Sequence, residues 1–251
     1  DYSYDPSIVI GPAGTPYATW KDTGWYHDDF DIYVRRFSSS NWEEVGTGSA
    51  SGTGISPPPE GSNSASIAIT LDGTPYVAWD EIVSGTRQIY TRRWNGSDWE
   101  EVGSGSATYG GISETAGVSR NRWIVSGPDG FVYVVWQDDS DGDREIYMRR
   151  WNGSSWEEVG GTSASGGGIS DNNGDSMDAG IATGPDGTVY VAWADDSSGN
   201  YETYVRQWTG SASTGSSTNV ASDPARGEAA SARTVTPPGL RSAIYAGVYF
   251  T

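Results

Sequence analysis

The sequence predicts an all-β protein, a β-propeller built from four-stranded antiparallel blades. One stretch occurs four times, and its two clearest copies run from Gly127 to Trp151 and from Gly184 to Trp208. A tryptophan marks the same point in each copy, at intervals of 59, 57 and 57 residues: Trp20, Trp79, Trp136 and Trp193. A period of this size indicates a supersecondary unit that buries its faces only by stacking against its neighbours.

The composition supports a single domain with an aromatic core. Of the 251 residues 35% are hydrophobic, yet 12 are Trp and 15 are Tyr, and each such ring buries roughly 150–250 Å². The 35 glycines lie between apolar segments that recur regularly, which indicates turns rather than disorder. We therefore expect one propeller domain over residues 1–251, with repeats at about 6–56, 64–113, 121–170 and 178–223 and a partial repeat at 227–251.

Each repeat predicts four short strands. The first strands are expected at Pro6–Ile10, Ala65–Thr70, Arg122–Ser126 and Ala179–Thr183. The second strands are expected at Pro16–Trp20, Pro75–Trp79, Phe131–Trp136 and Thr188–Trp193. The third strands are expected at Asp31–Phe37, Gln88–Trp94, Glu145–Trp151 and Glu202–Trp208, and the fourth at Trp42–Val45, Trp99–Val102 and Trp156–Val159.

The strands differ in polarity in the way that propeller blades require. The second strand is apolar on both faces, as in Phe131–Trp136, which is typical of a strand between two packed layers. The fourth strand carries paired glutamates such as Glu100 and Glu101, and charged, short edge strands avoid pairing with other chains. Pro-Asp-Gly and Asn-Gly-Ser segments supply the turns within a blade. A dry middle and a charged outer edge indicate a propeller blade.

The end of the sequence departs from the pattern. Ser211–Asp223 lacks the Trp-Glu-Glu-Val signature, and Ala230–Thr236 with Ser242–Phe250 repeats only the first hairpin of a blade. We therefore expect a five-bladed ring with an abbreviated last blade, closed by the leader Asp1–Asp5 beside the last hairpin. The alternative is a fragment of a longer propeller.

Charge and composition exclude several classes of partner. The formal net charge is −18, from 33 acidic and 15 basic residues, so nucleic acids and anionic membrane surfaces would be repelled. The sequence contains no run of about 18 apolar residues, so membrane insertion is not expected. The absence of cysteine excludes disulfides and thiolate metal sites. The sequence starts at Asp1 without Met, as expected of a processed chain. We expect a secreted or cell-surface protein of bacterial origin.

Two segments resemble known propeller families. Pro185–Tyr204 and Pro128–Tyr147 resemble the repeats of TolB-like and sialidase-like (BNR-type) bacterial β-propellers, which implies the propeller fold over nearly the whole chain. The sialidase resemblance would also imply three arginines that clasp a substrate carboxylate and a tyrosine nucleophile. Here Asp129 stands one place late for the sialidase Asp-box, and most arginines occur in repeated pairs, so the resemblance does not favour hydrolysis.

Aromatic and cationic residues suggest sites for sugars. Trp79, Trp136 and Trp193 are either stacking platforms between blades or inter-blade core. Arg93 and Arg150 either donate hydrogen bonds to sugar hydroxyls beside a tryptophan or pair with fourth-strand glutamates. Trp25 and Tyr26 lie in a distinctive loop of the first repeat, where aromatic residues are typical ligand contacts.

The third repeat also carries an acidic loop. Asp138, Asp139, Asp141 and Asp143 surround Gly142, and such carboxylates suit calcium, which takes six to eight oxygen ligands. The loop lacks the full twelve-residue calcium pattern, and Asp and Gly are also ordinary turn residues. Calcium is thus the one cofactor that the sequence suggests, with no cofactor as the alternative.

These patterns favour a non-enzymatic lectin that binds glycans at several weak, repeated sites, without catalytic residues. One alternative is a structural or adhesive module whose partner is an extracellular protein. The other is a glycoside-processing enzyme, with carboxylates such as Asp28 and Asp143 brought together across the ring.

Overall fold

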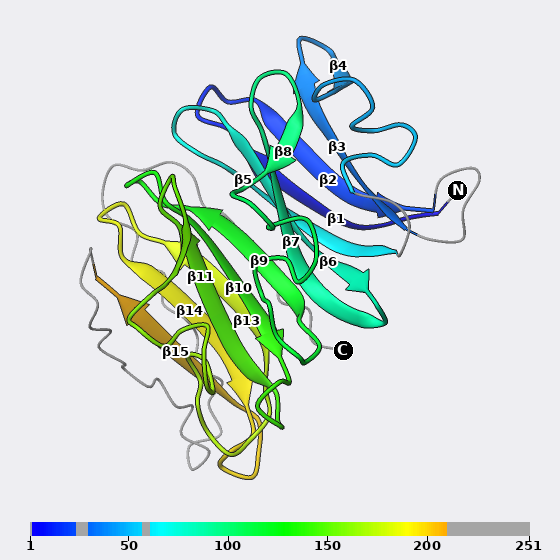
Figure 1. Ribbon diagram of the computed structural model, residues 1–251. Helices are drawn as coiled ribbons and strands as arrows, with labels where there is room; N and C mark the ends of the chain where they lie inside the picture. Colours follow the sequence, from blue (N-terminus) through cyan, green and yellow to red (C-terminus); the bar gives the residue numbers. More distant parts are fainter. Residues whose placement is uncertain (1, 24–29, 57–60, 210–251) are drawn as a thin grey trace.

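The computed structural model describes residues 2–23, 30–56 and 61–209, which form four antiparallel sheets in chain order (Figure 1). Blade 1 contains β1 (Ser3–Ile10), β2 (Pro16–Asp22), β3 (Asp31–Ser38) and β4 (Asn41–Glu44). Blade 2 contains β5 (Ser62–Ile69), β6 (Pro75–Val83), β7 (Thr86–Trp94) and β8 (Trp99–Glu101). Blade 3 contains β9 (Arg120–Ser126), β10 (Val132–Asp138), β11 (Glu145–Trp151) and β12 (Trp156–Glu158), and blade 4 contains β13 (Ser176–Thr183), β14 (Val189–Asp195) and β15 (Glu202–Trp208).

The arrangement of the sheets is that of a β-propeller, which confirms the predicted fold class. Each sheet is a meander in chain order, and neighbouring sheets meet along their first strands, β1, β5, β9 and β13. These strands therefore form the inner edge of the ring, and β4, β8 and β12 form its outer edge. The predicted abbreviated fifth blade falls on residues 210–251, outside the described residues.

The expected leader is not a separate segment. Ser3 and Tyr4 belong to β1 and pair with Asp22 and Lys21 of β2. The first strand of blade 1 is therefore longer than the predicted Pro6–Ile10, because the backbone hydrogen bonds of β2 continue past Trp20 to Asp22.

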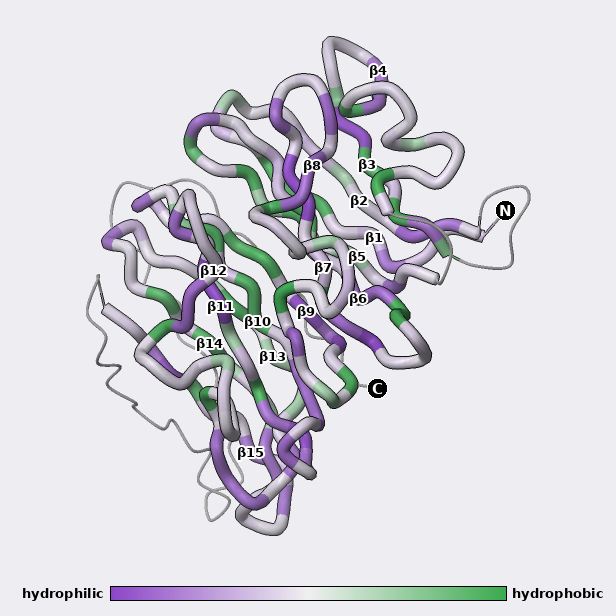
Figure 2. Tube along the Cα trace, in the orientation of Figure 1, coloured by the Kyte–Doolittle hydropathy of each residue, from purple (hydrophilic) through white to green (hydrophobic). Residues whose placement is uncertain are grey.

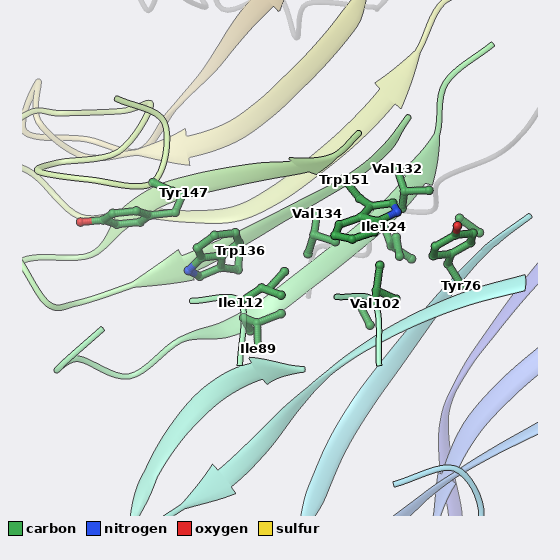
Figure 3. Close-up of a cluster of buried hydrophobic side chains, with 13 residues drawn as sticks. Tyr76, Ile89, Val102, Ile112, Ile124, Val132, Val134, Trp136, Tyr147 and Trp151 are labelled. Carbon is green, nitrogen blue, oxygen red and sulfur yellow. The ribbon is translucent and has the colours of Figure 1, made fainter. Parts of the chain in front are cut away.

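Aromatic and β-branched side chains fill the spaces between blades. The cluster between blades 2 and 3 includes Trp136, Tyr147 and Trp151, with Val134 and Ile89 (Figure 3). All seven residues of β10 are buried, as predicted for a strand packed on both faces. Hydrophobic residues concentrate along the strands and hydrophilic ones in the loops (Figure 2).

The repeated tryptophan of each second strand lies opposite a tyrosine of the third strand. Trp136 pairs with Tyr147 across β10 and β11, and their rings stack with centroids 6.0 Å apart. The same pairing recurs as Trp20 with Tyr33, Trp79 with Tyr90 and Trp193 with Tyr204. Because cross-strand aromatic pairs add stability beyond buried area, this pair accounts for the regular tryptophan spacing.

Blades are also joined at the outer edge. The indole Nε1 of Trp99 donates to the carbonyl of Val45 in blade 1 at 2.8 Å, and Trp156 donates likewise to Val102 in blade 2 at 2.7 Å. Gly46 follows Val45 with a φ of 83°, and a Cβ there would overlap the ring of Trp94. The recurring Val-Gly sequence thus gives the next blade room to approach.

The two ends of the blades differ in their connections. At the end that we call the turn end (upper left in Figure 1), the first strand turns to the second and the third to the fourth. These turns are short and repeated, with Gly130 and Gly96 at φ values of 83° and 100°. At the opposite end, the loop end, the second strand leads to the third through loops that differ from blade to blade. Uniform turns indicate scaffold, whereas variable loops are where binding groups are usually found.

Candidate functional site

Each of the four inner strands carries a β-bulge near the loop end. The registers between first and second strands shift at the same repeat position in every blade. The bulged residues have positive φ values of 50°, 32°, 52° and 55°: Asp5, Ser64, Asn121 and Asp178. Positive φ is uncommon outside glycine but enriched for Asp and Asn, and bulges re-aim side chains and often adjoin active sites. The inner edge is therefore the candidate functional site.

Polar contacts join the inner edges of blades 1 and 2. The Ser64 hydroxyl donates to the Asp5 carboxylate at 2.9 Å, and Lys21 Nζ lies 2.9 Å from the same carboxylate. Lys21 Nζ also donates to Asn63 Oδ1 at 3.1 Å. Partial burial raises the pKa of Asp5, but the hydrogen bonds from Lys21 and Ser64, with the charges of Lys21 and Arg122, outweigh it and lower the pKa. Asp5 is therefore ionised at neutral pH.

A second ion cluster joins blades 2 and 3 at the same end. The Asp80 carboxylate lies 2.5 Å from Arg87 Nη1 and 2.6 Å from Arg122 Nη1. Arg122 reaches across from β9, and its side chain is as buried as that of Asp80. Two guanidinium groups around one carboxylate compensate for its desolvation. This cluster fixes the position of β9 relative to blade 2.

A serine and a carboxylate pair where each first and second strand meet at the loop end. Ser176 donates to Asp195 at 2.7 Å, and Ser62 donates to Glu81 at 2.6 Å. Asp195 Oδ1 also accepts from the Ser197 N–H at 3.0 Å. Burial raises the pKa of Asp195, but the hydrogen bonds from Ser197, Ser176 and Asn172 outweigh it, so its pKa is lowered.

Glu81 differs from its counterparts. Its Oε2 accepts from Ser62 and from Trp79 Nε1 at 2.8 Å, but its buried Oε1 has no hydrogen-bond partner. Burial therefore raises the pKa of Glu81 to about 7, even though the two hydrogen bonds lower it. Glu81 is 3% exposed, so it acts within the interface between blades 1 and 2 rather than on a ligand.

The tryptophans and arginines that the sequence suggests for sugar binding do not come together. Trp79 and Trp136 are 0% exposed and Trp193 is 3% exposed, all in the inter-blade clusters, where a sugar ring would reach them only if the blades separated. Arg93 pairs with Glu100 at 2.9 Å and Arg150 with Glu157 at 2.5 Å. These pairs lie toward the turn end and confirm the alternative expectation of a cross-strand ion-pair ladder.

Trp25, Tyr26 and Asp28 lie outside the described residues. Asp138 is buried and accepts hydrogen bonds from Thr115, Ser119 and the Ser140 N–H.

Asp139 accepts from the Val118 N–H at 2.7 Å, and Asp141 is exposed. Across residues 2–23, 30–56 and 61–209, no three or more acidic, histidine or cysteine side chains, Asp143 included, gather as a metal site. Calcium stays a prediction.

Sequence analysis misses the residues of the inner edge. Asp5, Ser64, Asn121 and Asp178 each lie one residue before a predicted first strand and match no motif, and their recurrence at the same repeat position is the signal that would have found them. It also misses Trp123 of β9, which is 44% exposed. The loop end of the inner edge thus combines carboxylates, an amide, a hydroxyl and an accessible aromatic ring, which are groups suited to ligand binding.

Comparison with known proteins supports the fold. No protein-family model matches the chain, and no curated protein matches it. A protein of unknown function from Dyadobacter fermentans is similar in structure, with a TM-score of 0.56 and 14% identity over 86% of this chain and 68% of that one. A Hadza microbial sialidase gives a TM-score of 0.54 and 14% identity over 86% of this chain. An α-L-arabinanase from Penicillium chrysogenum, complexed with arabinobiose, gives 0.51 and 13% over 86%.

The chain spans 46% of the length of the sialidase and 66% of that of the arabinanase. At such low identity the likeness shows the fold alone, and it supports the sialidase-like part of the sequence resemblance, while the TolB-like part stays a prediction. The expected non-enzymatic lectin is contradicted, because the similar sialidase and arabinanase are named as glycan-cleaving enzymes. In the part of the chain that the structure describes, no helix is long and apolar enough to cross a membrane.

Proposed function

We propose that this protein processes glycans as a glycoside hydrolase whose substrate site lies at the loop end of the inner edge. The observation that carries the proposal is the repeated bulge, which presents two exposed carboxylates, Asp5 and Asp178, on the inner strands of blades 1 and 4. Glycoside hydrolysis uses a pair of carboxylates on either side of the scissile bond. Ser64 and Asn121, on the two strands between them, supply hydrogen-bonding groups for sugar hydroxyls.

The surroundings of Asp5 suit the ionised member of such a pair. Lys21 lies 2.9 Å from its carboxylate, and the lowered pKa keeps it charged at neutral pH. An ionised carboxylate serves as nucleophile in a retaining hydrolase or as general base in an inverting one. Asp178 is the candidate for the second carboxylate. The similar sialidase and arabinanase are named for the cleavage of glycans, which supports glycans as the substrate class.

The test is hydrolysis of a substrate panel that includes arabinan, arabino-oligosaccharides and 3′-sialyllactose. We expect turnover of at least one substrate and a loss of about 10²–10⁴-fold in kcat for Asp5→Asn, the range for removal of an acid–base group. Asp98→Asn is the matched control, because Asp98 is exposed in a turn-end loop of blade 2. Absence of turnover, or full activity of Asp5→Asn, would refute the proposal.

A further inference from the structure

Trp123 breaks the repeat on the inner edge, where its side chain is 44% exposed although the residue at this position in blade 2, Ser66, is 3% exposed. It pairs with Val135, the residue before the repeated tryptophan of β10. The same position holds Ser7, Ser66 and Gly180 in the other three blades. Three small residues show that the fold does not need a large side chain there. Ligand binding therefore explains a half-exposed indole at this position better than core packing does.

The neighbouring inner strand leaves space and polar groups beside this position. β13 runs next to β9, and a Cβ added to Gly180 of β13 would meet no atom within 4 Å. The bulged residues Asn121 and Asp178 lie two positions before Trp123 and Gly180 on their strands, roughly 7 Å along each strand. An aromatic face next to an amide and a carboxylate offers a sugar both an apolar surface for its C–H groups and partners for its hydroxyls.

The cations at the loop end indicate the charge of the sugar. Among the described residues, five cationic side chains lie near the loop end, and each faces a carboxylate. The pairs are Lys21 with Asp5, Arg87 and Arg122 with Asp80, Arg120 with Asp139, and Arg144 with Asp175. A substrate carboxylate would have to displace one of these partners, in a chain whose net charge is −18. Electrostatics thus favour an uncharged sugar.

We propose that Trp123 is the stacking platform of a subsite for an uncharged saccharide, flanked by Asn121 and Asp178. The inference rests on the proposed glycoside hydrolysis and specifies its substrate class. Glycan processing at this edge then starts from a neutral sugar ring stacked on the indole of β9, with the scissile bond directed toward the inner-edge carboxylates.

The experiment compares Trp123→Ser with Trp42→Ser by calorimetric titration of arabinotriose and of 3′-sialyllactose, and by kinetics on any substrate that is turned over. Serine is chosen because blades 1 and 2 carry it at the position of Trp123. Trp42 is the matched control, since it is 42% exposed but lies on the outer edge. We expect the wild type and Trp42→Ser to bind arabinotriose alike, and Trp123→Ser to bind it about 3- to 10-fold more weakly, the range for loss of one aromatic contact.

The kinetic expectation is a KM that rises by the same factor while kcat changes little. Equal binding by Trp123→Ser and the wild type, no binding of arabinotriose by the wild type, or tighter binding of the sialylated sugar would overturn the inference. Turnover with an unchanged KM in Trp123→Ser would overturn it while the proposed function stands. Arabinotriose binding that depends on Trp123 without any turnover would instead remove the proposed function and leave the subsite. Trp123→Phe keeps an aromatic face and should retain most of the affinity, which separates stacking from a general loss of folding.

Discussion

Equivalent isoleucines on the first strands of blades 1 and 2 differ in burial: they are exposed in blade 1 and buried in blade 2. In blade 2, Ile67 and Ile69 of β5 are 5% and 6% exposed, because they pack against blade 1. Their counterparts in blade 1, Ile8 and Ile10 of β1, are 67% and 60% exposed within the described residues. The sequence pattern is the same in both blades, so burial is not a property of the repeat itself. The burial of these isoleucines comes from packing against the preceding blade.

The outer edge shows the same contrast. Trp99 and Trp94 form a ring pair in blade 2, and the Trp99 indole donates to the Val45 carbonyl of blade 1. In blade 1, Trp42 and Phe37 form the equivalent pair, with centroids 5.6 Å apart, and both are exposed. Cross-strand pairing therefore forms within one blade, whereas the inter-blade hydrogen bond needs a neighbour.

The largest expected effect is at the isoleucines. Ile67→Ala should lower the free energy of unfolding by about 2–5 kcal/mol, since it leaves a cavity between two blades. Ile8→Ala should change it by less than about 0.5 kcal/mol, as at other exposed positions. Urea denaturation of both variants measures the difference. Equal losses would contradict the comparison and would mean that blade 1 is covered in solution.

The second prediction concerns Glu81, which the interface between blades 1 and 2 buries. Its folded-state pKa of about 7 lies above its ordinary value of 4.5. The folded state therefore holds this proton more tightly, so the stabilisation is present below pH 4.5 and is lost as the pH rises through 7. Glu81→Gln should remove this loss and gain about 3 kcal/mol relative to the wild type between pH 4 and pH 8.

Urea denaturation at a series of pH values tests this. Asp195→Asn is the matched variant in blade 4, where the lowered pKa has the opposite consequence. Ionised Asp195 stabilises the fold above the ordinary aspartate pKa, and the stabilisation is lost as the pH falls. Asp195→Asn should therefore be less stable than the wild type at pH 7. A Glu81→Gln variant with the pH dependence of the wild type would show that Glu81 is not desolvated.

The smallest effect is expected at the outer edge. Trp99→Phe should cost about 1–3 kcal/mol, because it leaves the Val45 carbonyl without its indole donor. Trp42→Phe should be nearly neutral, because Trp42 is exposed and reaches no preceding blade among the described residues. Thermal denaturation of the two variants side by side provides the measurement. A larger loss for Trp42→Phe would reverse the assignment of the covered and uncovered faces.

The sequence alone predicts the blades because each strand carries its own local signal. The tryptophan before the loop end, the Trp-Glu-Glu outer strand and the glycine turns recur at fixed spacing. The structure forms strands at the first two and turns at the glycines. The pairing of Arg93 with Glu100 also follows from spacing, since cross-strand neighbours on one face are set by the turn between them.

The candidate site is not predictable in the same way. Asp5 and Ser64 lie far apart in the chain, and only the packing of β1 against β5 brings their side chains into contact. The positive φ of the bulged residues depends on a register shift that has no motif of its own. Trp123 belongs to a predicted strand, where a tryptophan is usually core. The comparison with Ser66 and Gly180 shows only that Trp123 breaks the repeat, whereas its 44% exposure is seen in the structure alone.

The most direct test of the account is a crystal structure of the Asp5→Asn variant with arabinotriose. We expect the sugar at the loop end of the inner edge, with one ring stacked on Trp123 and the next near residue 5. A sugar on the outer edge beside Trp42, or between blades against Trp136, would contradict it.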